Sequence, residues 1–243
     1  MAIAYVGGQV AGRTNPTSAT EVTFSFTGGL SSTPAAGDLV IVTAVTGSQG
    51  GTPAMAVTTP TGYTALGQLD QPATRDTSLD VSYKFMGGTP DTTVTIPGTT
   101  DNAWAEAYSI QAFRGVDTTT PLDATSTSAE NIDSSRCNPA SITPVTTGAY
   151  VVICGGGAAA TGANYTAPAN YTTNFLTASG ADTTDAMVGS GYREWAGGAE
   201  NPAAYTGGTT NAGDTWAVYT IALRPAADAI AGYPYIGGGY YPA

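Results

Sequence analysis

The sequence predicts an all-β protein, an antiparallel and jelly-roll-like β-sandwich built from two sequence-related halves, with a Tyr- and Gly-rich C-terminal tail. Three observations carry this prediction. Only 10% of the 243 residues are charged, and Thr and Gly are abundant, as is typical of strand-and-turn proteins. Apolar residues alternate with polar ones at the period of a β-strand. Finally, four sequence blocks occur twice in the same order.

The repeated blocks lie about 110 residues apart. Two copies of that length are too few and too long for a solenoid. We expect one sandwich over residues 1–225, with halves of about 1–120 and 121–225; two tandem immunoglobulin-sized sandwiches are the alternative. The blocks are Gly37–Val45 with Gly148–Gly156, Pro60–Thr64 with Pro168–Thr172, Tyr83–Gly88 with Tyr192–Gly198, and Trp104–Arg114 with Trp216–Arg224.

The first strands of the first half follow from their apolar patterns. Val22, Phe24 and Phe26 alternate with hydroxyl residues, which predicts a strand with one apolar face. The β-branched run Leu39–Val45 is typical of a strand in the middle of a sheet. Gly-containing turns lie between these runs.

Three further strands follow. The segment Leu79–Met86 alternates apolar and polar residues, and Val94–Ile96 predicts a short strand. Trp104, Tyr108 and Ile110 share one face of the last strand, on which Glu106 is an unusual polar member. Trp104 and its equivalent in the second half, Trp216, are therefore predicted to lie in the core.

The pattern changes after Pro225. Residues 226–231 have the composition of a single helical turn, and residues 232–243 are of low complexity. Gly and Pro separate five anchor residues there, and Tyr gives a large contact area with few torsions to freeze. We predict that the tail, residues 226–243, binds a partner subunit through these anchors. They are Tyr233, Tyr235, Ile236, Tyr240 and Tyr241.

The net charge of −11 argues against nucleic acid and anionic membranes as partners. Lys84 is the only lysine, so an acidic surface would be repelled by nucleic acid and by an anionic membrane. The first residues have neither a basic segment nor a long apolar segment, so we expect no signal peptide and synthesis in a cytoplasm. In that reducing compartment Cys137 and Cys154 are expected to be free thiols, with an intrachain disulfide or a crosslink between subunits as alternatives.

Residues suited to catalysis are scarce, and the prediction is a non-enzymatic protein without a cofactor. The chain has no histidine. Glu106 and Glu194 lie among aromatic residues and are candidates for a glycosidase pair, against the simpler interpretation as acids on a sandwich face. Two pairs of acids are candidate calcium ligands, against the simpler interpretation as solvated loop residues. They are Asp76 with Asp80, and Asp182 with Asp185.

Aromatic residues suggest a different function. Tyr63, Tyr165 and Tyr171 are expected at loop edges, where they suit either stacking on a sugar ring or packing between subunits. These residues make a carbohydrate-binding module the alternative to a protein-binding one.

Three segments together resemble duplicated β-sandwich structural proteins of tailed bacteriophages and their prophages. They are Gly37–Val42, Pro60–Thr64 and Ala107–Asp123, and the second half carries matching blocks. The resemblance covers roughly residues 20–225 and implies a structural protein of the virion, most simply a capsid decoration or head-fibre protein, made in the host cytoplasm. Its expected partners are other capsid or tail subunits and further copies of itself. The alternative is a carbohydrate-binding or adhesion module, whose ligand would be a glycan.

Overall fold

The computed structural model describes residues 1–49, 57–99, 105–132, 136–159, 165–166, 168–179, 185–207 and 214–227. This part of the chain is all-β with antiparallel sheets, which confirms that part of the predicted fold class. The predicted tail anchors and Trp104 lie outside the described residues.

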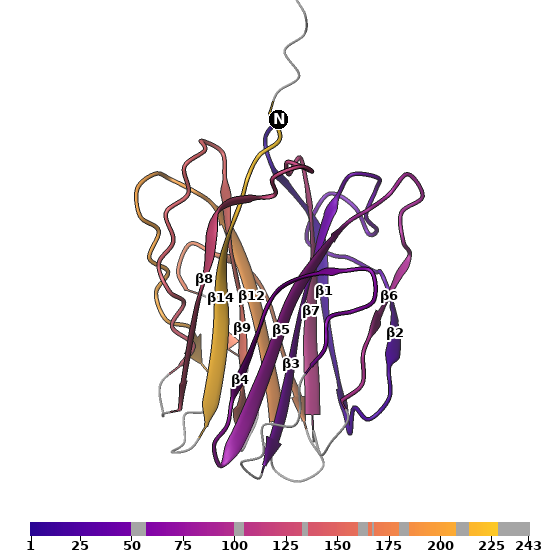
Figure 1. Cartoon of the computed structure of the whole chain (residues 1–243), viewed down its shortest axis with the longest axis vertical. Coiled ribbons are helices and arrows are strands. Elements are labelled where there is room, and N and C mark those ends of the chain that lie inside the picture. The colour runs from indigo at the N-terminus through magenta and orange to yellow at the C-terminus, as the bar shows by residue number, and fades with distance from the viewer. Residues whose placement is uncertain are drawn as a thin grey trace, which may run out of the picture.

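The first half of the chain forms a five-stranded sheet with the order β1-β7-β3-β5-β4. A separate two-stranded sheet pairs β2 with β6 and lies beside it (Figure 1). The strands are β1 (Ala4–Thr14), β2 (Thr20–Thr23), β3 (Leu39–Gln49), β4 (Thr64–Gln71), β5 (Arg75–Phe85), β6 (Thr93–Ile96) and β7 (Ala105–Arg114).

The second half forms a five-stranded sheet with the order β8-β14-β9-β12-β11, and a two-stranded sheet of β10 and β13. When the strands of each large sheet are numbered along the chain, both sheets have the order 1-5-2-4-3. The strands are β8 (Leu122–Ile132), β9 (Tyr150–Ala159), β10 (Tyr165–Thr166), β11 (Thr172–Ser179), β12 (Asp185–Glu194), β13 (Thr206–Gly207) and β14 (Thr215–Leu223).

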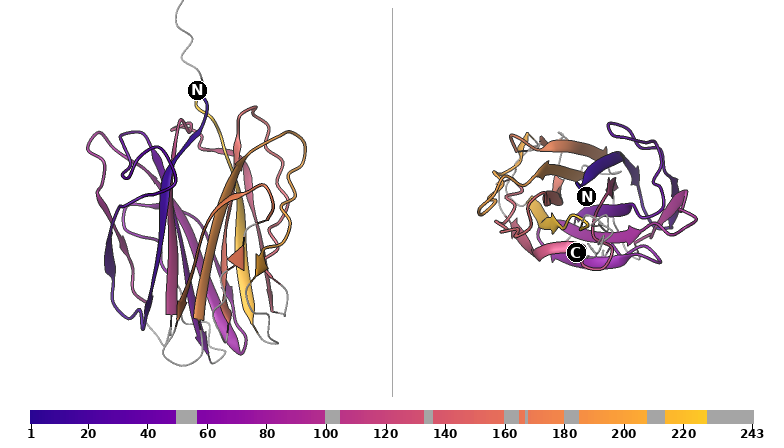
Figure 2. Two further views of the ribbon diagram at one scale, coloured as in Figure 1. Left: turned by 180° about the vertical axis from the view of Figure 1, so that it is seen from behind. Right: turned by 90° about the horizontal axis from the view of Figure 1, so that it is seen from above.

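The two large sheets pack face to face, and the largest core lies between them (Figure 2). Residues such as Ile41 and Leu79 from the first sheet meet Val152 and Ile221 from the second. The two sheets approach closely at β9, where a Cβ on Gly156 would lie 2.6 Å from Cγ2 of Val45 in β3 of the facing sheet. Only a residue without a side chain fits there.

Additional cores cover the outer faces of both sheets. On the first sheet, Val22 and Ile96 from the small sheet pack on Val42 and Ile110. On the second sheet, Trp216 is 5% exposed and packs in the outer core, as predicted for a core residue. Strands β5, β7 and β14 are consequently buried on both faces over most of their length.

Two local predictions differ from the structure. The strand predicted over Val22–Phe26 ends at Thr23, because Phe24 and Phe26 bond through their backbone N–H groups to the loop carbonyls of Thr92 and Ser32. Both rings are nevertheless buried. The helical turn predicted over 226–231 is absent at its described start, where the N–H of Ala226 donates to Gly115.

Candidate functional site

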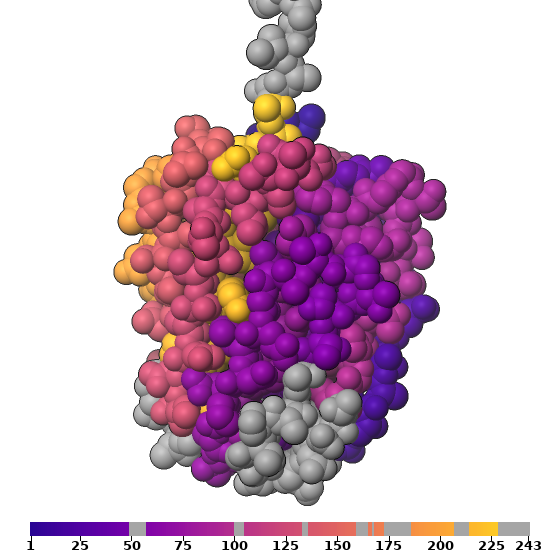
Figure 3. All heavy atoms as spheres, viewed as in Figure 1, coloured from indigo at the N-terminus to yellow at the C-terminus, as the bar shows by residue number. Residues whose placement is uncertain are grey.

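Both ends of the described chain meet at one end of the sandwich, which we call the terminus end (Figures 1 and 3). The N-terminal ammonium of Met1 donates a hydrogen bond to the carbonyl oxygen of Ala226 at 2.6 Å. The N–H of Ala226 donates to Gly115 at 2.7 Å, and Pro225 forms a bridge with Val116. Backbone contacts therefore fix the path of the chain up to the first residues of the tail.

Glycine is required at position 115 for the N-terminal residues and the root of the tail to pack against each other. Gly115 has a φ of +80°, which residues with a side chain rarely adopt. A Cβ at this position would also lie 2.5 Å from the carbonyl oxygen of Ala2. The turn after β7 thus brings the N-terminal residues against the root of the tail.

An ion pair holds the chain immediately before the tail. The guanidinium of Arg224 donates from Nε to Oδ1 of Asp123 at 3.1 Å, and the Asp123 side chain is fully buried. Burial raises the pKa of Asp123, but hydrogen bonds from Thr146 and Val145 together with Arg224 outweigh burial and lower it. Asp123 therefore stays ionised and anchors β14, β8 and the loop before β9 to one another.

The matching position of the first half carries the same kind of contact. Arg114 binds Asp38 through two hydrogen bonds of 2.8 and 2.9 Å, and the Asp38 side chain is fully buried. The paired carboxylate raises the pKa of Arg114. Each arginine is the last residue of a repeated sequence block, but the two aspartates do not lie at equivalent positions of the repeat. The sequence repeat therefore predicts the two arginines as a pair, whereas only the fold shows which aspartate each one binds.

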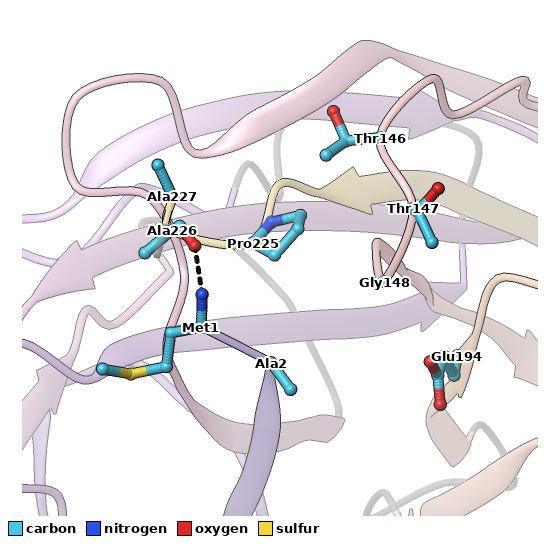
Figure 4. Close-up of a pocket in the computed structure, with 9 residues that line it drawn as sticks. All are labelled: Met1, Ala2, Thr146, Thr147, Gly148, Glu194, Pro225, Ala226 and Ala227. Carbon is cyan, nitrogen blue, oxygen red and sulfur yellow. Dashed lines mark hydrogen bonds between the residues drawn. The ribbon is translucent and has the colours of Figure 1, made fainter. Parts of the chain in front are cut away.

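A pocket of about 350 Å³ opens beside the root of the tail (Figure 4). Met1 and Ala2 line one side, Pro225–Ala227 line the next, and Thr146–Gly148 with Glu194 complete it. Most of the lining is apolar. Glu194 is exposed and makes no ion pair within the described part of the chain. The pocket therefore offers an apolar wall together with a free carboxylate acceptor.

The candidate acid pair is not brought together. Arg13 and Glu106 pair across β1 and β7 at the far end from Ala4 and Arg114, whereas Glu194 lines the terminus-end pocket. At about 3.3 Å per residue, the two acids lie roughly 30 Å apart. Glu106 is fully buried and bound to Arg13, and burial outweighs that contact and raises its pKa. It is a structural acid of the outer core.

The interpretation of Asp76 and Asp80 as solvated loop residues is wrong. Both lie in β5 and are buried, because the loop before β4 covers this face of the sheet. Asp80 accepts a hydrogen bond from Thr59 at 2.8 Å, and burial raises its pKa. Four residues along a strand span about 13 Å, so these two acids cannot share one calcium ion.

No group of three potential metal ligands occurs within the described ranges. The second candidate pair cannot be placed in the same way: Asp182 and the side chain of Asp185 lie outside the described residues.

The three tyrosines proposed for sugar stacking pack within the chain. Tyr165 is buried and meets the ring of Tyr205 at 5.6 Å. The hydroxyl of Tyr171 donates to Glu200 at 2.9 Å, and the guanidinium of Arg193 lies over the Tyr171 ring.

Tyr63 has a buried hydroxyl, and the ammonium of Lys84 lies 5.9 Å from its ring centre. The expectation of an exposed aromatic ring is therefore wrong for Tyr165, whereas Tyr63 and Tyr171 are half-buried in the loops just before β4 and β11.

The two cysteines are free thiols, as expected. Cys154 lies in the core between the large sheets, and Cys137 lies in the core on the outer face of the second sheet. Burial raises the pKa of each thiol to about 12. A crosslink between subunits does not fit this arrangement, since neither side chain is exposed.

The described part of the chain contains no helix that could span a membrane. The five anchors of the tail lie beyond Ala227, outside the described residues, so their binding role stays a prediction. No protein-family model, curated protein or solved structure matches the chain.

Proposed function

We propose that this chain is a non-enzymatic structural protein of a bacteriophage virion that decorates the particle surface. The observation that carries the proposal is the fixed root of the tail. Residues 224–226 are held by an ion pair and by backbone hydrogen bonds, so the tail starts from a rigid base at one end of the sandwich. A rigid base lowers the entropy lost when the following segment docks on a partner.

In the proposed arrangement the terminus end faces the particle and the sandwich projects from it. The tail supplies the docking anchors, which are predicted from sequence. The acidic surface keeps the body soluble and favours partners that bind an uncharged segment. The glycan-binding alternative has less support, because Tyr165 is buried and the other two tyrosines are half-buried against cationic side chains.

We also infer that the two halves descend from a duplication. The shared strand order of the large sheets supports this inference. So do the matched arginines, which each close a half by binding a buried aspartate. The chain has a single lysine, so few long charged side chains would have to be ordered when copies pack side by side on a particle.

Purified particles of the phage or prophage that carries the gene test the proposed function. We expect the full-length chain to co-purify with the particles at a fixed, high copy number. Truncation after Ala227 keeps this base and should leave a soluble protein with nearly unchanged melting temperature that no longer joins the particle. A control chain with a Gly/Ser tail of equal length separates loss of the anchors from loss of length. Normal incorporation of either variant would contradict the proposal.

A further inference from the structure

Exposed apolar side chains gather at the terminus end. Among the described residues, three of the four exposed large apolar residues lie there: Met1, Leu30 and Val145 have 63%, 65% and 70% of their surface exposed, and the fourth, Ile132, lies at the opposite end of β8. The N–H of Leu30 donates to Tyr5 near the start of β1, and that of Val145 donates to Asp123, the partner of Arg224. All three therefore lie near the root of the tail, at the end that holds the pocket.

The chemistry of the pocket fits a tyrosine side chain. Its volume of about 350 Å³ is at the lower end of the roughly 300–1,000 Å³ of small-molecule sites, and accommodates a phenol ring. Pro225 and the neighbouring alanines give an apolar wall for the ring (Figure 4). Glu194 gives a carboxylate acceptor for the hydroxyl donor.

The tail carries such side chains on an uncharged segment. Sixteen residues follow Ala227, and none after Asp228 is charged. Fully extended at about 3.4 Å per residue, they reach roughly 50 Å from the pocket rim. Two bodies of charge −11 repel one another, so an uncharged arm is the segment by which one copy can approach another. Pro225, Ala226 and Ala227 at the root of the tail form one wall of the pocket.

We propose that the terminus-end pocket binds a tyrosine from the tail of a second copy of this chain. This tail exchange links copies into a homo-oligomer through their terminus ends. The inference rests on the proposed docking role of the tail, and it names the partner as a further copy of the same chain.

Disulfide trapping between two full-length variants tests the exchange. One variant carries Thr147→Cys at the pocket, and the other carries Gly237→Cys, which leaves every tail anchor in place. A disulfide between positions 147 and 237 then joins two chains by construction. The native thiols, being fully buried, do not compete. A Thr125→Cys variant on the exposed side of β8 is the control for random collision.

We expect the 147–237 disulfide to form in at least about tenfold higher yield than the 125–237 disulfide. Glu194→Ala should weaken self-association about tenfold, as expected for one hydrogen bond to a charged group. Equal yields at 147 and 125 would overturn the proposal. It would also be overturned if only the double variant formed the disulfide, within a single chain. If the chain is incorporated into particles normally but no 147–237 disulfide forms, the tail exchange is overturned. The proposed function then still holds, and the tail binds a different protein.

Discussion

Replacing Thr77 by Val should destabilise the protein by about 2–4 kcal/mol, although the side chain keeps its shape. Thr77 is buried between the two large sheets, where its Oγ1 accepts a hydrogen bond from the N–H of Ala158 at 2.8 Å. It also lies 2.7 Å from Oγ1 of Thr215. Leaving the Ala158 N–H buried without a partner costs about 1–3 kcal/mol, and the lost hydroxyl contact adds about 1 kcal/mol.

Urea unfolding of the two single variants and the double variant measures this effect. Thr77→Val and Thr215→Val should each lower the free energy of unfolding with an unchanged m-value, and the double variant should lose less than the sum of the two. Thr95→Val, at an exposed position of β6, is the matched control and should stay within about 0.5 kcal/mol of the unmodified chain. A loss below about 0.5 kcal/mol for Thr77→Val would refute the contact between β5 and the second sheet.

Three other outcomes are expected. Gly156→Ala should prevent soluble folding because its Cβ would lie 2.1 Å from a backbone oxygen, whereas Gly87→Ala meets no atom within 4 Å and should fold normally; expression and circular dichroism distinguish them. Because the pKa of Cys137 and of Cys154 is about 12, a thiol reagent at pH 8 should label neither in the folded protein and both in urea. The lowered pKa of Asp123 means that its contribution to stability is present at neutral pH and lost as the pH falls below about 4. In Asp123→Asn, the free energy of unfolding in urea should therefore decrease less between pH 7 and pH 3 than in the unmodified chain.

The all-β class and most of the strands can be predicted from local sequence patterns alone. Alternation and β-branched runs depend only on local geometry, so β3, β5 and β6 fall where the pattern places them. Burial of Trp216 follows from its place among apolar neighbours. The predicted strand over Val22–Phe26 is too long, because the N–H of Phe24 donates to Thr92, far along the chain, and that of Phe26 donates to Ser32 in the following loop, rather than to a paired strand.

Which polar residues are buried, and which residues meet, depends on how the layers pack. A strand pattern distinguishes two faces but does not show that a second layer covers the polar face, so it predicts exposed or half-exposed acids at Asp80 and Glu106, which are both buried. Contacts such as Arg224 with Asp123 join residues about a hundred positions apart, and no local pattern encodes them. The terminus-end pocket arises for the same reason. Its walls come from the two ends of the described chain, the loop before β9 and the last residue of β12, which become neighbours only when the two sheets pack on their common core.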